Sequence, residues 1–256
     1  MADAGRPLAL VTGPTAGIGA AFARALAGEG HDLVLVARDA ARLEQTAADL
    51  TDRYGVACRT LSADLATDDG TAAVAQVLRE EPVRVLVNNA GFGIYGRFAD
   101  NDLADELRML DLDVRSVLVL THAAVNAMTA RGGGDIVNVS SVGGFVPRAS
   151  GATYVGAKAW VTGFTEALAQ QLTGTGVRVC AVCPGYTHTE FHERAQADMS
   201  RVPDWMWLEA DQVVAEGLAD LRRGRPVSVP SLRYKSLLTA VKLLPRATVR
   251  RALGNS

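Results

Sequence analysis

The chain has 256 residues, a length within the range of one large α/β domain. Its residues are 48% hydrophobic and 21% charged, a composition typical of a globular protein with a large core, so disorder and fibrous repeats are excluded. A formal net charge of −2 excludes bulk electrostatic attraction of the whole protein to nucleic acid.

Short apolar runs alternate along the chain with longer segments of helical periodicity. Strands are predicted at residues 8–12, 32–37, 56–61, 83–87, 135–140 and 177–182. Helices are predicted up to about residue 27, from about residue 40, and over 71–78, 103–130 and 152–172. The strands are continuously apolar, which indicates burial on both faces and parallel pairing through helical crossovers. We therefore expect a single α/β domain over residues 1–256, a doubly wound parallel sheet flanked by helices.

The first predicted strand is followed by a glycine-rich turn, Thr12-Gly13-Pro-Thr-Ala-Gly17-Ile-Gly19. Glycine permits positive φ and lets a pyrophosphate approach the backbone, while the following helix presents unpaired N–H groups. The spacing is G-x-x-x-G-x-G, and the alternative interpretation is an ordinary strand-to-helix turn. Its position at the first strand–helix junction favours a dinucleotide site formed by five residues of the turn: Gly13, Thr15, Gly17, Ile18 and Gly19.

The end of the second predicted strand, Val36-Ala37-Arg38-Asp39, selects the cofactor. A carboxylate there binds the adenosine ribose and repels a 2′-phosphate, whereas a guanidinium pairs with that phosphate. Arg38 therefore favours NADP (NADPH) over NAD. Asp39 keeps NAD open, and the alternative for the pair is a solvated Arg38 beside an Asp39 that caps the next helix.

Three cysteines, Cys58, Cys180 and Cys183, indicate a reducing compartment rather than a disulfide scaffold. Cys180 and Cys183 form a C-x-x-C pair, but the chain has no second pair and Cys180 falls in a predicted strand, so we expect no metal or redox site. Residues 7–23 are uncharged but interrupted by glycines and a proline, which argues against a signal peptide. No run reaches the roughly 18 apolar residues of a membrane span, so we expect a cytoplasmic protein.

The fourth predicted strand is followed by Asn88-Asn89-Ala90-Gly91. With this motif, the chain resembles the short-chain dehydrogenase/reductase family over nearly its whole length. The other matching elements are the glycine-rich turn, Asp64-Leu65, Ser141, Tyr154-x-x-x-Lys158 and Pro184-Gly185. The resemblance implies a Rossmann-type fold. It also implies dinucleotide contacts beyond the turn, at Asp64, Leu65, Asn89, Ala90, Gly91, Tyr154, Lys158, Pro184, Gly185, Thr187 and Thr189.

Tyr154 and Lys158 are four residues apart on a predicted helix and so share one face. An ammonium about 5 Å from a phenol favours the phenolate by about 3 kcal/mol at an effective dielectric constant of about 20, which is roughly two pKa units. Ser141 closes the fifth strand, where its hydroxyl can bond the same substrate oxygen. The resemblance makes Tyr154 the acid/base, Lys158 the ribose contact and pKa tuner, and Ser141 the carbonyl stabiliser. The alternative is an amphipathic helix with a core tyrosine and a snorkelling lysine.

One position departs from the family pattern. Many members carry an Asn 28 residues before the catalytic Ser, where this chain has Asp113. The family Asn holds a water in a proton path to the lysine, so the resemblance adds Asp113 to the catalytic set. A carboxylate accepts from water but has no amide donor, and when ionised it opposes the phenolate. We therefore predict a water relay with altered pH dependence, the alternative being that either residue is tolerated without effect.

The stretch after Pro184-Gly185 passes the nicotinamide in the family, with the Thr189 hydroxyl and the Thr187 main chain near the carboxamide. The segment of about 186–208 is the expected substrate lid. We expect apolar residues of the lid and of neighbouring loops to form a hydrophobic pocket: Phe92, Ile94, Tyr95, Phe145, Val146, Phe191, Met199, Trp205, Met206 and Trp207. His188 and His192 lack a third ligand nearby, so no metal is expected.

The last 36 residues contain nine basic residues and no acidic one, so the first 220 carry a net charge of −11. Within this basic tail, about 231–256, an apolar helical stripe is formed by Leu237, Leu238, Val241 and Leu244. We favour docking of this helix on a subunit or on the rest of the chain, and the alternative is contact with an anionic membrane surface.

These features predict an NADP(H)-dependent oxidoreductase that interconverts a ketone and a secondary alcohol on a hydrophobic substrate. We expect a homo-oligomer, a dimer or tetramer, that binds no nucleic acid. Two alternatives stay open: a non-catalytic dinucleotide-binding sensor or scaffold of the same fold, and another reaction such as dehydration or epimerisation.

Overall fold

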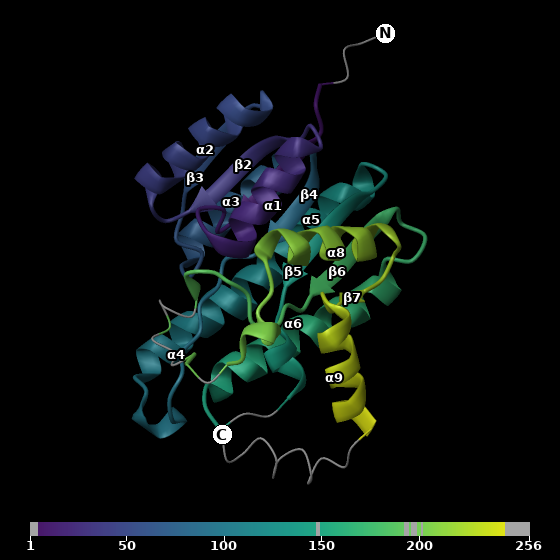
Figure 1. Ribbon diagram of the computed structural model, residues 1–256. Helices are drawn as coiled ribbons and strands as arrows, with labels where there is room; N and C mark the ends of the chain where they lie inside the picture. Colours follow the sequence, from purple (N-terminus) through teal and green to yellow (C-terminus); the bar gives the residue numbers. More distant parts are fainter. Residues whose placement is uncertain (1–4, 147–148, 192–194, 196–198, 201, 244–256) are drawn as a thin grey trace.

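The computed structural model describes residues 5–146, 149–191, 195, 199–200 and 202–243. Within these residues a sheet of seven parallel strands has the order β3-β2-β1-β4-β5-β6-β7 (Figure 1). The strands are β1 Leu8–Thr12, β2 Asp32–Ala37, β3 Cys58–Ser62, β4 Val83–Asn88, β5 Gly134–Val139, β6 Val177–Val182 and β7 Val227–Ser228. The strand order reverses at β1 and β4, which confirms the doubly wound parallel sheet.

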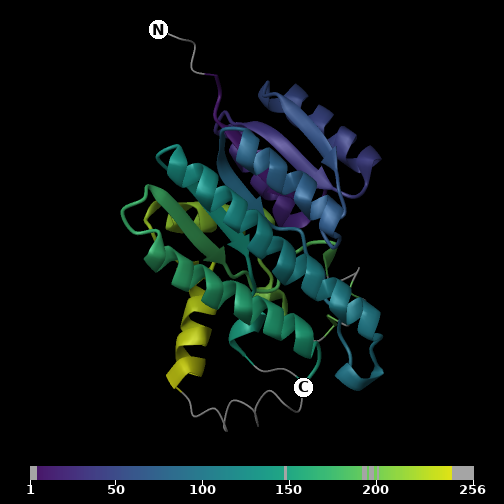
Figure 2. The ribbon, with the colours of Figure 1, turned by 180° about the vertical axis from the view of Figure 1, so that it is seen from behind.

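Helices cover both faces of the sheet (Figures 1 and 2). One face carries α1 Gly17–Gly28, α2 Ala40–Tyr54 and α8 Ala210–Arg222. The other face carries α3 Asp68–Glu80, α5 Ser116–Ala130 and α6 Ala152–Gln171. Ala9 and Val11 of β1 belong to the first core and Leu10 to the second, as the alternation of side chains along a strand requires. The central strands are therefore apolar on both faces.

Polar side chains and glycine set the ends of several helices. Asp39 caps α2, since its carboxylate accepts from the Arg42 backbone N–H at 3.1 Å. Thr67 caps α3 by accepting from the Gly70 N–H at 3.1 Å. α2 ends at Gly55, whose φ of 65° lies in the left-handed region. Asp39 is thus a helix cap, as the sequence had allowed.

The helix predicted over residues 103–130 is interrupted. α4 Leu103–Leu110 is separated from α5 by a π-helical turn, Asp111–Arg115. In this turn the Ser116 hydroxyl donates to the Leu112 carbonyl at 2.5 Å. π-turns of this kind commonly occur at functional sites, because the extra residue redirects a side chain.

Two further expectations need correction, and two elements were not predicted. β3 does not lie between two covered faces: it is an edge strand in which no residue is fully buried. Ser141 lies beyond the end of β5 and begins a short 3₁₀ helix, Val142–Phe145. Helix α8 and strand β7 had no predicted counterpart in the sequence. Strand β7 has only two residues, which pair with β6, and is too short to show a periodic pattern.

The basic apolar-striped helix is α9, Leu232–Leu243. It docks on its own chain: Lys235 Nζ lies 3.4 Å from Glu216 Oε2 of α8, and Leu238 is buried. Leu244 and the rest of the basic tail lie outside the described residues. None of the helices in the described part of the chain combines the length and the hydropathy that crossing a lipid bilayer requires.

Candidate active site

The loops beyond the carboxyl ends of the strands surround a large cavity of about 1340 Å³. Among the predicted site residues, those that line it are Gly13, Thr15, Gly17, Ile18, Arg38, Asp64, Leu65, Asn89, Ala90, Gly91, Ser141, Tyr154, Lys158, Pro184, Gly185, Thr187 and Thr189. Gly19 and Asp113 do not line the cavity. Motifs spread over most of the chain therefore meet at the switch point of the sheet, where doubly wound proteins bind ligands.

The glycine-rich turn forms a cradle with no room for side chains. Gly13 and Gly17 have φ values of 65° and 54°. A Cβ on Gly19 would lie 2.0 Å from Gly13 O, and a Cβ on Gly17 would lie 2.8 Å from Thr189 Cγ2. α1 begins here, and Ala16 at its N-terminus offers no side-chain cap to the first N–H groups. This shape and these free donors fit a pyrophosphate.

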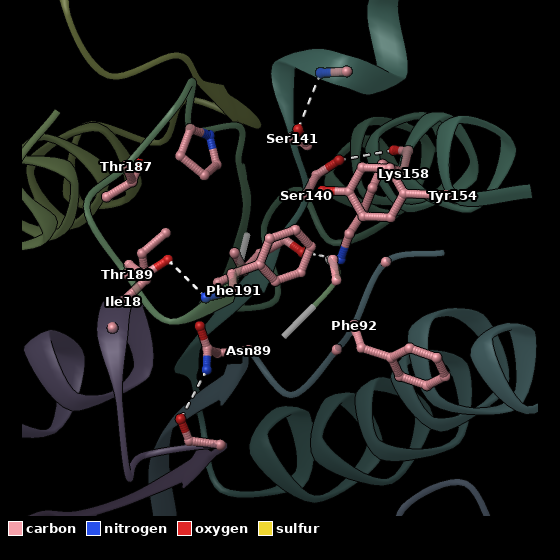
Figure 3. Close-up of a pocket in the computed structure, with 18 of the residues that line it drawn as sticks. Ile18, Asn89, Phe92, Ser140, Ser141, Tyr154, Lys158, Thr187, Thr189 and Phe191 are labelled. Atoms are coloured by element: carbon pink, nitrogen blue, oxygen red, sulfur yellow. Dashed lines mark hydrogen bonds between the residues drawn. The ribbon is translucent and has the colours of Figure 1, made fainter. Parts of the chain in front are cut away.

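Thr12 and Asn89 hold that turn against the end of β4. Thr12 Oγ1 accepts from the backbone N–H groups of Asn89 at 2.9 Å and Ala90 at 3.0 Å. Asn89 Nδ2 donates to Thr12 O at 3.0 Å. It also donates to Gly13 O at 3.1 Å (Figure 3). The Asn89 side chain therefore braces the turn. Thr12 was not among the predicted site residues, although its place before Gly13 was the available signal.

Tyr154 and Lys158 lie on α6 and line the cavity with Ser141 (Figure 3). The two α6 residues are 7% and 6% exposed. Lys158 Nζ is 5.8 Å from the centroid of the Tyr154 ring and donates to Val139 O at 3.2 Å. Ser141 Oγ accepts from the Gly143 N–H at 3.0 Å, so its own proton can be donated to a ligand.

Two aromatic rings hold the ring of Tyr154 in place. The centroid of Phe191 is 5.8 Å away and that of Tyr95 is 6.0 Å away, both in tilted arrangements. Gly93 leaves space for them, since a Cβ there would lie 3.2 Å from Phe191 Cζ and 3.4 Å from Tyr154 Cδ2. The phenol therefore has a defined orientation at the cavity wall.

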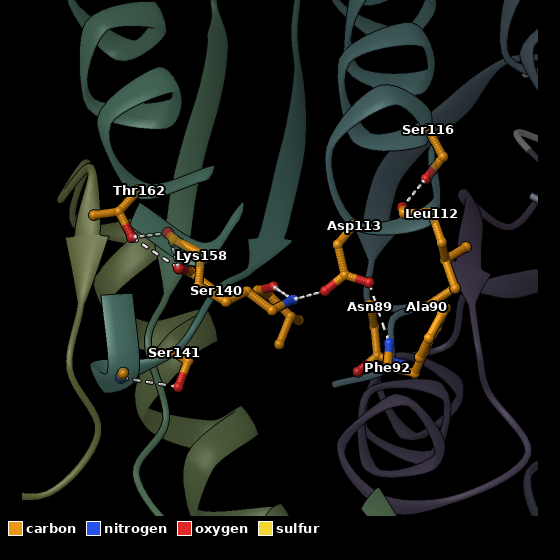
Figure 4. Close-up of polar contacts among 12 residues, drawn as sticks. Asn89, Ala90, Phe92, Leu112, Asp113, Ser116, Ser140, Ser141, Lys158 and Thr162 are labelled. Carbon is orange, nitrogen blue, oxygen red and sulfur yellow. Dashed lines mark hydrogen bonds and ion pairs between the residues drawn. The ribbon is translucent and has the colours of Figure 1, made fainter. Parts of the chain in front are cut away.

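Asp113 contacts the lysine directly (Figure 4). Its side chain is fully buried, and Oδ2 lies 3.0 Å from Lys158 Nζ. Oδ1 accepts from the Phe92 N–H at 3.1 Å. Burial raises the pKa of the Asp113 carboxyl above its ordinary value, and the Lys158 ammonium opposes this rise. A Cβ on Gly91 would lie 2.9 Å from Oδ1, so the glycine leaves room for the carboxylate.

Ser140 supports the helix turn that carries the lysine. Its hydroxyl donates to Lys158 O at 2.8 Å and lies 2.8 Å from Thr162 Oγ1 (Figure 4). All three residues are buried. Ser140 lines the cavity beside Ser141. The family pattern marked only Ser141, and nothing local in the sequence predicted the bonds of Ser140 to α6.

Acidic and basic side chains meet at the far end of the cavity from Tyr154 along the sheet, beyond β2 and β3. Arg38 is exposed there and lines the cavity. Asp64 accepts from the Ala66 N–H at 3.0 Å and from Arg108 Nη2 at 2.6 Å. Partial burial pushes the pKa of Asp64 up, but the bonds from Arg108 and Ala66 outweigh it, and the pKa lies below its ordinary value.

Arg42 of α2 contacts both the glycine-rich turn and the predicted lid. Its Nη2 donates to Thr15 O at 3.1 Å and to Glu190 Oε1 at 3.1 Å. Both charged side chains are partly exposed and line the cavity. Arg42 was missed from sequence, although it lies only four residues after Arg38, in the first turn of α2. Arg108 was also missed, and no local pattern pointed to it.

The loop after β6 lies close to the glycine-rich turn. Thr187 is buried and its hydroxyl donates to Gly185 O at 3.0 Å. Thr189 Oγ1 accepts from the Phe191 N–H at 3.3 Å (Figure 3). Thr189 therefore links the loop to the aromatic residue beside Tyr154, while its methyl group approaches Gly17.

The rest of the lining is largely apolar. Of the predicted pocket residues, those that line the cavity are Phe92, Tyr95, Val146, Phe191, Met199 and Met206. Those predicted for the pocket that do not line it are Ile94, Phe145, Trp205 and Trp207. Trp205 is 59% exposed, and Trp207 stacks on His188 with centroids 4.7 Å apart.

His192, considered with His188 for a metal, lies outside the described residues. Cys180 and Cys183 are both fully buried, and burial raises the pKa of their thiols to about 12 and about 11. In the part of the chain that the structure describes, no group of three or more His, Cys, Asp or Glu side chains is placed to hold a metal ion.

Comparison with known proteins identifies the family. A family model described as short chain dehydrogenase matches residues 7–200. Sulfoacetaldehyde reductase 2 of Chromohalobacter salexigens is 35% identical over 218 residues, which cover 84% of this chain and 86% of that protein. Acetoacetyl-CoA reductase of Paracoccus denitrificans is 34% identical over 214 residues, which cover 80% of this chain and 86% of that protein.

Solved structures agree. A short-chain dehydrogenase from Sphingobium yanoikuyae in complex with NADPH superposes with a TM-score of 0.85 at 37% identity, covering 92% of this chain and 93% of that one. A bulky-bulky ketone specific alcohol dehydrogenase from Comamonas testosteroni superposes with a TM-score of 0.81 at 30% identity, covering 95% of this chain and 96% of that one. The chain belongs to the short-chain dehydrogenase/reductase family of oxidoreductases.

Proposed function

We propose that this oxidoreductase uses NADP(H) to interconvert a ketone and a secondary alcohol on an apolar substrate. The observation that carries the proposal is that Tyr154, Lys158 and Ser141 line the same cavity as the glycine-rich cradle. Hydride transfer to a carbonyl needs a dinucleotide beside a group that exchanges a proton with the carbonyl oxygen.

The cavity residues fit a nicotinamide dinucleotide in three parts. The cradle would hold the pyrophosphate through Gly13 and Gly17, while Gly19 lets the helix pack closely against Gly13 O. The nicotinamide and its ribose would contact Lys158, Thr187 and Thr189, beside Pro184 and Gly185. The adenosine would contact residues of the β2–β4 ends: Arg38, Asp64, Leu65, Asn89, Ala90 and Gly91. The sequence pattern rather than any contact in this cavity suggests these individual roles.

Two guanidinium groups support NADP over NAD. Arg38 lies in the turn between β2 and α2, Arg42 lies in the first turn of α2, and both line the cavity. A 2′-phosphate carries charge that such groups bind strongly through charge-assisted hydrogen bonds. The Sphingobium yanoikuyae relative is described in complex with NADPH, which is consistent with this choice.

The proton chemistry follows from the side chains. When bound, the nicotinamide supplies the hydride to the carbonyl carbon or takes it from the alcohol. Tyr154 holds the proton that the substrate oxygen gains or loses, and Ser141 donates a hydrogen bond to that oxygen. Lys158 Nζ, 5.8 Å from the Tyr154 ring centroid, favours the phenolate by about 3 kcal/mol at an effective dielectric constant of about 20.

Asp113 acts through Lys158 and is a positioning residue in this proposal. Its carboxylate holds the ammonium at 3.0 Å on the side away from the cavity. When ionised it offsets part of the positive charge felt by Tyr154, and when protonated it does not. The raised pKa of Asp113 thus makes its protonation state part of the pH dependence.

Apolar lining on the substrate side supports a hydrophobic ketone. Phe92, Tyr95, Phe191 and Met206 offer aromatic and thioether surface rather than charge. The Comamonas testosteroni relative, described as specific for bulky-bulky ketones, shares the fold over 95% of this chain. A substrate with apolar groups on both sides of the carbonyl is therefore the first class to test.

The test measures NADPH oxidation at its absorbance band against a panel of apolar ketones. We expect turnover by the wild type, and a loss of several hundredfold or more in Tyr154→Phe, which keeps the ring but has no proton to exchange. Full activity in Tyr154→Phe would refute the mechanism. A matched control is Tyr54→Phe at the C-terminal end of α2, outside the cavity lining, for which we expect unchanged rates.

A non-catalytic sensor or scaffold is the second candidate, favoured only by Asp113 in place of the family Asn. Thermal-shift titration with NADPH and NADH distinguishes it, because a sensor is stabilised by the dinucleotide without turning over any ketone. Turnover in the ketone panel would exclude this candidate.

We also propose a homo-oligomer, dimer or tetramer, in the cytoplasm. Exposed apolar side chains on α4 and the start of α5 support an intersubunit contact: Leu103, Leu107, Leu110 and Leu118. Light scattering after gel filtration measures the assembly, and a mass of one chain at micromolar concentration would contradict it.

A further inference from the structure

Helix α9 crosses the substrate side of the cavity. It follows β7, the last strand of the sheet, and contacts the short 3₁₀ helix Val142–Phe145 (α9 is yellow in Figure 1). Four of its residues line the cavity: Tyr234, Leu237, Leu238 and Val241. The first turn of α9 therefore meets the loop after β6, and the next two turns present aliphatic side chains to the same space.

Tyr234 anchors this helix. Its hydroxyl accepts from the Tyr186 N–H at 3.0 Å and donates to Met206 O at 2.8 Å, and the side chain is 4% exposed. Arg233 adds a third bond, from Nη1 to Trp205 O at 2.6 Å. One helical turn is thus bonded to both ends of the segment predicted as the lid.

The ring of Tyr234 also explains Gly185. A Cβ on Gly185 would lie 2.0 Å from Tyr234 Cζ and 2.2 Å from Cε2, far inside van der Waals contact. The ring therefore packs directly on the backbone of the Pro184-Gly185 turn. α9 and the turn proposed to pass the nicotinamide are consequently fixed relative to each other.

We propose that α9 forms the wall of a substrate subsite for a bulky aliphatic or aryl-alkyl group. This wall is made by Leu237, Leu238 and Val241, and Tyr234 is its positioning residue. This inference rests on the proposed ketone reduction. It identifies the ketone substituent that the enzyme would recognise. Leu238 is 7% exposed and Leu237 is 47% exposed, so a ligand in the cavity would cover apolar surface that water now reaches.

If α9 forms this wall, its side chains affect the selectivity between long and short ketones rather than the overall rate. A small ketone leaves the α9 side chains untouched, whereas a long substituent contacts them in the ground state and in the transition state. In an apolar pocket, one methylene of lost contact changes kcat/KM by about tenfold or more. Shortening the wall therefore lowers activity toward the long ketone and leaves the short one unaffected.

The experiment compares butan-2-one with 1-phenylhexan-1-one in the full chain. For Leu238→Ala and Leu237→Ala we expect kcat/KM for the long ketone to fall about tenfold while that for butan-2-one stays within twofold. Val241→Trp fills the cavity, so it should exclude the long ketone and admit the short one. Tyr234→Phe removes only the anchoring hydroxyl and should raise KM for the long ketone more than it changes kcat. Leu232→Ala on the same helix, 78% exposed and outside the cavity lining, is the control.

Calorimetric titration of 1-phenylhexan-1-one into the same proteins needs no turnover. We expect affinity to fall about tenfold in the wall variants and not in Leu232→Ala. Equal affinity and an equal selectivity ratio in all variants would overturn the wall. Weakened binding together with no reduction of any ketone would instead refute the proposed function and leave the wall standing.

Discussion

Replacing Asp113 by Asn tests how the buried carboxylate controls the acidity of Tyr154. Oδ2 lies 3.0 Å from Lys158 Nζ, which is 5.8 Å from the ring centroid. Oδ2 can therefore lie no farther than about 8.8 Å from the ring, where a unit charge contributes about 2 kcal/mol at an effective dielectric constant of about 20. That energy equals about 1.4 pKa units. An ionised carboxylate raises the cost of the phenolate, and the amide removes this charge without changing the shape.

The expected outcome of Asp113→Asn is a shift of the pH profile. In the alcohol oxidation proposed above, Tyr154 acts as the base and must be deprotonated, so we expect kcat/KM to rise with pH through the pKa of the phenol. With the negative charge gone, this rise should move to lower pH by about 1.4 units. In ketone reduction, the fall at high pH should move by the same amount in the same direction. The assay is kcat/KM in both directions between pH 5 and 10.

The control for this prediction is a neighbouring carboxylate that is exposed. Asp111→Asn makes the same chemical change two residues earlier in the π-helical turn, where the carboxylate is 42% exposed and pairs with Arg115 at 2.9 Å. We expect no shift in that variant. Superimposable profiles for wild type and Asp113→Asn would show that Asp113 carries no charge effect on the phenol, and the reasoning would be wrong.

Three further predictions concern the cofactor cleft and the loop after β6. Arg38→Gln should lower kcat/KM with NADPH by tenfold or more and leave NADH unchanged, since charged hydrogen bonds contribute about 1.5–3 kcal/mol; equal losses with both cofactors would contradict a phosphate contact. Glu190→Gln breaks the bridge to Arg42 and should speed NADPH release by about two- to fivefold in stopped flow, as a partly exposed ion pair contributes up to about 1 kcal/mol; an unchanged rate would remove the bridge as a restraint. Gly185→Ala should lower unfolding free energy by about 1–3 kcal/mol through the clash with the ring packed on it, measured by urea denaturation. Gly163→Ala, where a Cβ meets nothing within 4 Å, is its control and should be neutral or stabilising.

Local patterns were sufficient where an element depends on its own residues. The predicted strand at 32–37 matches β2, and that at 177–182 matches β6, because continuous β-branched and aliphatic runs between turns have few alternatives. The predicted strand at 56–61 was found as β3 at 58–62, but its burial on both faces was wrong, and the two-residue β7 was missed. Their stability comes from a neighbouring strand rather than from their own sequence.

In the candidate site, too, some features depend on local sequence and others on contacts between distant segments. Tyr154 and Lys158 share a face because of helical spacing, and the glycine-rich turn needs glycine because of its own φ values and close contacts. Arg42 and Arg108 were missed because their partners, Glu190 and Asp64, are distant in sequence. Neither residue carries a local sign of its contact.

The sequence by itself determined the parallel sheet, the glycine-rich turn and the placing of Tyr154 and Lys158 on one helix face, since each depends on residue types at fixed short spacings. Only the tertiary structure decided that Asp113 contacts Lys158 directly. It also decided that the apolar side chains of α9 line the cavity of their own chain and do not face an outside partner. Both contacts join segments 45 or more residues apart in the chain, between Asp113 and Lys158 and between Tyr186 and Tyr234. Such contacts arise from the packing of whole elements against one another, which local periodicity does not encode.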